Sequence, residues 1–213
     1  MKKVILVLAM LMAVFNLCFA DSPLTSTNFY KAYLDVPVVK AASKSPNKLS
    51  PEAKAYLFNE KNPLDVKMAL INAVGWHVNG QSTYKDYIQY CLNHFPKQKY
   101  GIAKNKILKI EDLFKYASSE QMAVLVYLYA MSDYTNTKAM YSLMQKAMEK
   151  PMTDKQSFML PMGLVYAQNC LDDSDNWSNI YSGIEYYVNG PKNKDMRPKA
   201  IKIIMDYIDL YKE

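Results

Sequence analysis

Arginine, histidine and glycine are scarce in this chain of 213 residues. It has one arginine, Arg197, two histidines, His77 and His94, and six glycines. Arginine is the side chain best suited to bidentate contacts with phosphates and guanines, so we expect no nucleic-acid partner despite the net charge of +6. So few glycines also argue against the glycine-rich turns that hold nucleotide phosphates, and the sequence contains no P-loop.

Signatures of catalysis are missing as well. The sequence contains neither a Gly-x-Ser-x-Gly nor a His-Glu-x-x-His motif, which would mark a nucleophile or a catalytic zinc. His77 follows an apolar segment and His94 lies beside Phe95 and Pro96, so both are interpreted as structural or solvent-exposed residues. We therefore predict that the protein is not an enzyme and uses no cofactor.

Two patterns resemble metal sites but are incomplete. Cys91 lies three residues before His94, but a structural zinc needs four ligands and no second pair is nearby. The acidic cluster at 172–176 resembles a calcium loop, yet position six is Trp177 instead of glycine and position twelve is Gly183 instead of glutamate. The acids are better explained as the N-terminal turn of a helix, where the helix dipole favours negative charge. The sequence predicts no metal site.

The first 20 residues have the organisation of a secretory signal peptide. Two lysines precede the apolar stretch at 4–14, and Ala20 provides a small residue before the expected cleavage point. The stretch is shorter than the about 20 residues that span a bilayer, and Leu17 is too large to precede a lipid-modified Cys18. We expect one exported, all-helical domain at 21–213, periplasmic or extracellular, without an integral membrane segment after cleavage.

Apolar residues recur at helical spacing along the rest of the chain, with no sustained strand-like alternation. Serine–proline and asparagine–proline pairs and capping boxes mark helix starts, because they satisfy the first free backbone N–H groups. The expected starts are Ser50-Pro51, Asn62-Pro63, Tyr84, Asn105, Ser118 with Gln121, Asn136, Thr153 with Gln156, Ser174 or Asp175, and Asp195. The helix from Asn62-Pro63 is expected to reach about Trp76, with Asn79-Gly80 closing it, and the helix from Thr153 to bend at Pro161. The fold class is predicted to be all-α.

A weak repeat suggests how these helices are arranged. Three apolar segments, at 67–71, 121–125 and 157–160, are each followed by an amphipathic helix, which begins near Tyr84, Asn136 or Trp177. An apolar helix needs cover on all sides, and an amphipathic neighbour provides part of it. The pattern predicts stacked helical hairpins in a short α-solenoid-like array or, alternatively, an irregular compact helical bundle. In both arrangements Leu125 and Leu164, at the middle of apolar runs, should be almost fully buried.

Cys91 and Cys170 are the cysteines of the expected mature chain, and an exported protein can form disulfides. In the array they belong to the first and third units, roughly 15–20 Å apart, whereas a disulfide needs Cα atoms within about 7 Å. We therefore predict two separate thiols, although a compact bundle would allow them to meet.

The absence of a catalytic signature favours a binding function. The eighteen tyrosines are interpreted mainly as core fillers and helix-surface residues, although tyrosine is also enriched at protein interfaces. The densest lysines, Lys97, Lys99, Lys104, Lys106 and Lys109, are interpreted as a solvated loop and helix face rather than a membrane-surface or polyanion patch. Abundant lysine, asparagine and tyrosine with one arginine are typical of an AT-rich bacterial source.

These observations predict an exported bacterial interaction module that binds a protein or peptide partner without catalysis. A periplasmic inhibitor or immunity-type protein is an alternative, and so is an enzyme whose site the sequence does not reveal.

Overall fold

Helices make up all the regular structure in the part of the chain that is described. The computed structural model describes residues 22–76, 82–151, 154–171 and 177–212. Its elements are α2 (Pro23–Ser26), η1 (Phe29–Tyr33), α3 (Pro37–Ser43), α4 (Pro51–Phe58), α5 (Leu64–Val74), α6 (Thr83–His94), η2 (Lys97–Tyr100), α7 (Ile110–Tyr116), α8 (Ser119–Ser132), α9 (Thr137–Met148), α10 (Gln156–Leu171), α11 (Asn179–Asn189), α12 (Pro198–Ile208) and η4 (Asp209–Tyr211). The predicted all-α class is confirmed.

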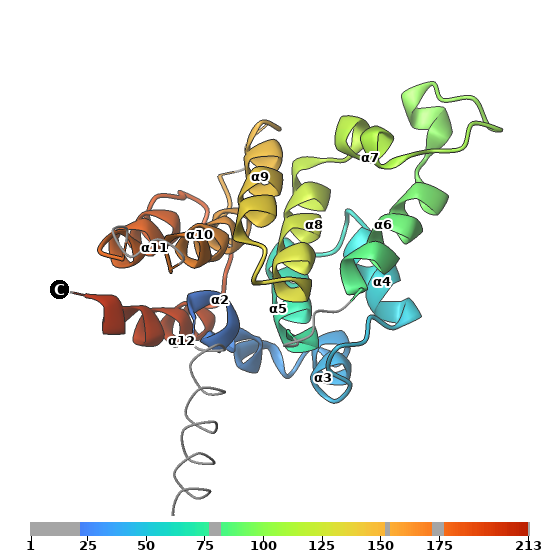
Figure 1. Cartoon of the computed structure of the whole chain (residues 1–213). Helices are drawn as coiled ribbons and strands as arrows, with labels where there is room; N and C mark the ends of the chain where they lie inside the picture. Colours follow the sequence, from blue (N-terminus) through green and yellow to red (C-terminus); the bar gives the residue numbers. More distant parts are fainter. Residues whose placement is uncertain (1–21, 77–81, 152–153, 172–176, 213) are drawn as a thin grey trace, which may run out of the picture.

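The core is built on three helices that are apolar around their whole circumference. These are α5, α8 and α10, which contain the three apolar segments of the repeat, and each of them contacts the other two. Leu125 is 2% exposed and Leu164 is 0% exposed, which confirms that both are buried. The amphipathic helices α6, α9 and α11 pack around this centre (Figure 1).

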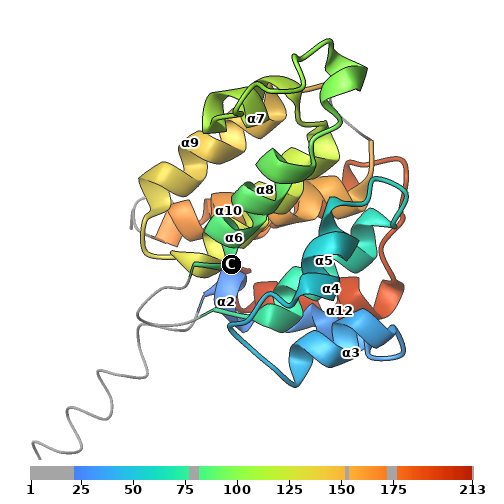
Figure 2. The ribbon, with the colours of Figure 1, turned by 90° about the vertical axis from the view of Figure 1, so that its right-hand side faces the viewer.

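The arrangement is a compact bundle rather than a stacked array. Two expected hairpins are present, since α9 packs on α8 and α11 packs on α10. The array would separate α5 from α10 by a whole unit, but these helices are in contact, and α6 packs on α8. The chain also closes on itself, because α12 packs against α2 and η1 (Figures 1 and 2).

Arg197 makes several contacts where the two ends of the described chain meet. Its backbone N–H donates to the Tyr33 hydroxyl at 3.0 Å, and its guanidinium donates to the Ala32 carbonyl at 2.8 Å and to Asp35. The guanidinium also lies 4.4 Å from the centre of the Tyr33 ring. One cationic side chain thus joins the start of α12 to η1.

Several helix starts follow the sequence signals directly. Ser50 accepts from the N–H of Ala53 at the start of α4, and Ser118 and Gln121 form the predicted capping box of α8. Asn136 caps α9 in the same way. Each of these caps joins residues three apart, so the local sequence is enough to reveal it.

Other boundaries differ from the predictions, for local reasons. The helix expected from Asn105 begins at Ile110. The helix from Asn62-Pro63 ends at Val74, because Gly75 has a φ of +76° that suits glycine better than other residues; Asn79-Gly80 lie outside the described residues. Pro161 lies inside α10, which runs from Gln156 to Leu171, and the bend expected there stays a prediction.

Asp195 caps a different helix from the one expected. The last helix begins at Pro198, and the Asp195 carboxylate accepts from the backbone N–H of Ser157 at 2.8 Å and from its hydroxyl. Asp195 therefore satisfies the start of α10 across a separation of 38 residues. Thr153 lies outside the described residues, and Gln156 donates from its side chain to the Val188 carbonyl.

The sequence signals missed the helices at 22–50. Both α2 and α3 have a proline in the first turn, and the Ser22 hydroxyl accepts from the N–H of Thr25. This start resembles Ser50-Pro51. However, helices of four and seven residues are too short to show a clear apolar period.

Candidate functional site

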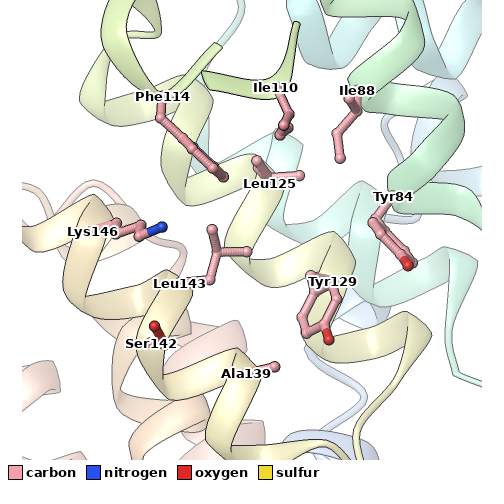
Figure 3. A pocket seen from close by; sticks show the side chains of 10 residues that line it. All are labelled: Tyr84, Ile88, Ile110, Phe114, Leu125, Tyr129, Ala139, Ser142, Leu143 and Lys146. Carbon is pink, nitrogen blue, oxygen red and sulfur yellow. The ribbon is translucent and has the colours of Figure 1, made fainter. Parts of the chain in front are cut away.

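An apolar groove lies along α8, between α6 and α7 on one side and α9 on the other. Its cavity volume is about 310 Å³, at the lower end of the range for ligand pockets. The lining residues, shown in Figure 3, are Tyr84, Ile88, Ile110, Phe114, Leu125, Tyr129, Ala139, Ser142, Leu143 and Lys146. They come from four helices and face a common space (Figure 3).

Each helix contributes residues spaced four apart. The floor is formed by Leu125 and Tyr129 of α8, and α9 contributes Ala139 and Leu143. The wall opposite is formed by Tyr84 and Ile88 of α6 and by Ile110 and Phe114 of α7. Residues four apart lie on the same face of a helix. The groove is therefore bounded by four short apolar ridges.

The groove leaves apolar surface open to solvent. Leu125 is buried at its base, whereas Ile88, Phe114 and Leu143 are each only partly buried. Both α6 and α9 pack on α8, which lies between them as the floor. Contiguous apolar surface in a concavity is typical of binding sites, since it is costly to leave in water.

Two aromatic contacts shape the groove, and one of them involves a charged group. The rings of Tyr84 and Tyr129 meet edge to face with their centres 4.9 Å apart. The Lys146 ammonium lies 4.7 Å from the centre of the Phe114 ring, within range of a cation–π interaction. None of the ion pairs found among the described residues involves Lys146, so its charge is available to an anionic group.

Tyr84, Tyr129 and Ser142 contribute the hydroxyl groups of the groove lining. Burial, and then the nearby charge of Asp133, raise the pKa of Tyr129, so its hydroxyl stays protonated at neutral pH. Ser142 is exposed on α9, and no histidine or carboxylate is among the lining residues to act as its base. A serine hydroxyl needs such a base to attack a substrate.

Cys91 and His94 do not form the site that their spacing suggested. Cys91 is fully buried, and burial raises the pKa of its thiol to about 12. His94 is exposed, contacts the Tyr90 carbonyl through Nδ1 at 2.8 Å, and stacks on the Tyr90 ring with a centroid distance of 4.0 Å. Within the described ranges, no group of three or more histidine, cysteine or acidic residues could hold a metal ion.

Cys91 and Cys170 are both buried and are not joined by a disulfide. The array geometry that motivated this prediction is wrong, but α8 packs against both α6 and α10 and lies between them. Cys91 on α6 and Cys170 on α10 therefore lie on helices that α8 separates. His77, Cys18 and the acidic cluster at 172–176 lie outside the described residues.

One buried charge escaped the sequence analysis. Lys67 of α5 is 1% exposed, and its burial lowers the pKa of its ammonium, with Glu120 and Glu60 opposing the shift. Glu120 already pairs with Lys155 at 2.6 Å. The apolar residues around Lys67 predict a buried side chain at this position, whereas lysine is usually exposed to solvent. The signal in the sequence was therefore a lysine within a run of residues that are otherwise expected to be buried.

Comparison with known proteins gives no assignment: no protein family, curated protein or solved structure matches the chain. None of the helices in the described residues has the length and apolar character to cross a bilayer.

Proposed function

We propose that the protein is an exported, non-catalytic interaction module whose groove receives the apolar face of a partner protein's helix. The observation that carries this proposal is the groove itself, where partly exposed apolar side chains from four helices face one concave space (Figure 3). Export is proposed from the N-terminal sequence alone.

The shape of the groove favours a helix as the occupant. Helices bind in apolar grooves through side chains spaced three, four and seven residues apart. The four ridges of this groove have matching i, i+4 spacing, so side chains of an incoming helix can pack between them. A volume of about 310 Å³ accommodates a few side chains, with the rest of the partner helix remaining outside.

The surrounding charge favours an acidic partner. Residues 83–150, which contain the groove helices, include ten lysines and six acidic residues. Lys85 and Lys146 are exposed beside the Tyr84 and Phe114 rings. Complementary charge speeds association and selects among partners more than it adds affinity. We therefore expect the partner helix to carry glutamate or aspartate beside its apolar stripe.

Two synthetic helical peptides test this proposal. Both have leucines at the same helical spacing, but one has glutamates on the flanks and the other has lysines, and binding is measured by isothermal titration calorimetry. We expect the acidic peptide to bind and the basic peptide to bind at least tenfold more weakly. Equal affinity for both, or no binding by either, would contradict the proposal.

Matched variants locate the binding. Ser142→Trp places a large ring at the groove and should abolish binding of the acidic peptide. Ser182→Trp is the control, because Ser182 is likewise an exposed serine on a helix, but on α11, which contributes nothing to the groove. Binding that survives Ser142→Trp, or that is lost equally in both variants, would place the peptide elsewhere.

A further inference from the structure

The connection between α6 and α7 is rich in lysine, and two of its lysines, Lys99 and Lys106, pair with Glu60 and Asp112 outside it. Residues 95–109 contain Lys97, Lys99, Lys104, Lys106 and Lys109 and no acidic residue. The segment extends from the body of the molecule on the side opposite the C-terminus (Figure 1). Its charge is therefore presented at an extremity, where a large surface could approach it.

This connection has a defined structure. The Lys97 ammonium donates to the carbonyls of Lys104 at 3.0 Å and Lys106 at 2.6 Å, so it ties the two sides of the loop together. Ile102 and Leu108 are buried at 9% and 8% exposure. Apolar anchors and hydrogen bonds thus fix the direction in which the residues between them point.

Ile107 is the apolar residue that this arrangement turns outward. It is 86% exposed, the highest value among the large exposed hydrophobic residues of the described chain, although its neighbour Leu108 is buried. An exposed isoleucine side chain forgoes the favourable free energy of removing apolar surface from water. Single exposed apolar side chains are common on protein surfaces, but Ile107 is combined with exposed lysines in a loop that is held by hydrogen bonds and buried anchors.

The lysines around Ile107 indicate the chemistry of that partner. Lys104, Lys106 and Lys109 are all exposed. Lys106 pairs with Asp112 at 2.7 Å, while neither Lys104 nor Lys109 takes part in an ion pair with another described residue. Two unneutralised ammonium groups thus flank the exposed isoleucine in sequence.

We infer that the loop tip at 104–109 docks on an anionic lipid bilayer, with Ile107 entering the interface and Lys104 and Lys109 facing lipid phosphates. The exposure of Ile107 among these lysines is the reason to replace the sequence-based interpretation of them as a purely solvated face. A lipid surface offers negative charge with apolar chains directly beneath it, which matches both features of the tip. A soluble polyanion would use the lysines but gain nothing from Ile107. This inference is independent of the groove and of any peptide bound there.

Vesicle co-sedimentation of the purified protein tests the inference. The probes are vesicles of phosphatidylcholine alone and of phosphatidylcholine mixed with phosphatidylglycerol. We expect binding to the mixed vesicles only, and weaker binding at high salt because salt screens the lysines. Ile107→Ser should lower the partition coefficient about tenfold, and Lys104→Ala and Lys109→Ala about fivefold each. Circular dichroism establishes that each variant remains folded.

Leu210→Ser is the matched control, because Leu210 is 74% exposed but lies on η4, near the C-terminus. It should bind mixed vesicles as the unmodified protein does. The inference is overturned if the unmodified protein fails to sediment with mixed vesicles, if Ile107→Ser binds normally, or if Leu210→Ser weakens binding as much as Ile107→Ser. It is also overturned if the protein binds heparin but not the vesicles.

Discussion

Gly163 of α10 lies directly against Tyr187 of α11: a Cβ atom at Gly163 would come within 2.9 Å of the Tyr187 Cβ. The relationship is reciprocal, since a Cβ at Gly183 of α11 would lie 2.6 Å from a ring carbon of Tyr166 of α10. Each helix thus provides a glycine where the other provides a tyrosine. This exchange allows α10 and α11 to approach closely without leaving a void.

Gly163→Ala should therefore destabilise the protein, although alanine usually stabilises the interior of a helix by about 0.5–1 kcal/mol relative to glycine. The Tyr187 Cβ is fixed to its backbone, so relief requires the helices to separate, with an expected loss of about 1–3 kcal/mol. Gly183→Ala should cost less, because its contact is with a ring that can turn. Urea unfolding of both variants shows which of them loses more stability. A stabilised Gly163→Ala variant would show that the helices tolerate the extra carbon atom.

Leu164→Ala should lower the free energy of unfolding by about 2–5 kcal/mol, because it leaves a cavity in the core. Leu164 is fully buried on α10 and is not among the residues that line the groove. Peptide binding should consequently persist under conditions in which the variant is folded. Denaturant titration and calorimetry measure the two effects separately, and a loss below about 1 kcal/mol would contradict the packing described for α10.

Lys67→Met should raise the free energy of unfolding at neutral pH by about 1–4 kcal/mol, since it removes the cost of burying a charge. The folded-state pKa of Lys67 lies below the unfolded value near 10.5. Between these values the unfolded chain binds more protons, so the unmodified protein gains stability as the pH rises through that window.

The stability advantage of Lys67→Met should consequently shrink as the pH approaches 10.5. Urea titrations of both proteins at several pH values measure this difference, and shared tyrosine ionisations cancel in the comparison. A variant that is less stable at every pH, by a constant amount, would mean that the ammonium is well satisfied where it lies.

Arg197→Ala should cost about 1–3 kcal/mol, because it removes a hydrogen bond to the Ala32 carbonyl and the cation–π contact with Tyr33. Asp35→Asn should cost clearly less than Arg197→Ala, because the Asp35 side chain is 69% exposed and exposed ion pairs contribute little. Thermal unfolding of the two variants compares these contributions. Equal losses of stability in the two variants would mean that the ion pair between Arg197 and Asp35 accounts for the stabilisation instead.

The proposed export leads to a separate prediction about the N-terminus. The first residue of the exported protein should be Asp21, because Ala20 ends the expected signal peptide. N-terminal sequencing of protein recovered from the periplasm or medium measures this directly. A chain that begins at Met1, or at a lipid-modified Cys18, would refute the predicted cleavage.

Several features that depend on residues close together in the sequence were predicted correctly, whereas others that depend on residues far apart in the sequence were not. The Ser118–Gln121 capping box and the burial of Leu125 were predictable, because each depends on residues within one or two turns. Asp195 was assigned to the start of the nearest helix, whereas its carboxylate caps α10 from 38 residues away. No local pattern distinguishes these two uses of an aspartate.

The groove shows the same limit. The sequence indicated an amphipathic helix from Tyr84, but which helix covers its apolar face depends on tertiary packing. The stacked-hairpin interpretation paired α6 with α5, and the contact of α6 with α8 instead leaves part of the α6 face at the groove. Ile107 was expected inside a helix that in fact begins at Ile110, so its exposure was not anticipated.

The contact between Arg197 and Tyr33 joins residues 164 positions apart, which has a consequence for the timing of folding. A growing chain that has not yet reached Arg197 lacks α12, the helix that packs against α2 and η1. Closing so long a loop is slow, and its entropic cost is recovered only when the final helix docks. The packing of α2 and η1 against α12 therefore cannot form until residues 198–208 have been synthesised. Under the proposed export, this delay would leave the chain in a state that can still be threaded through a translocation channel.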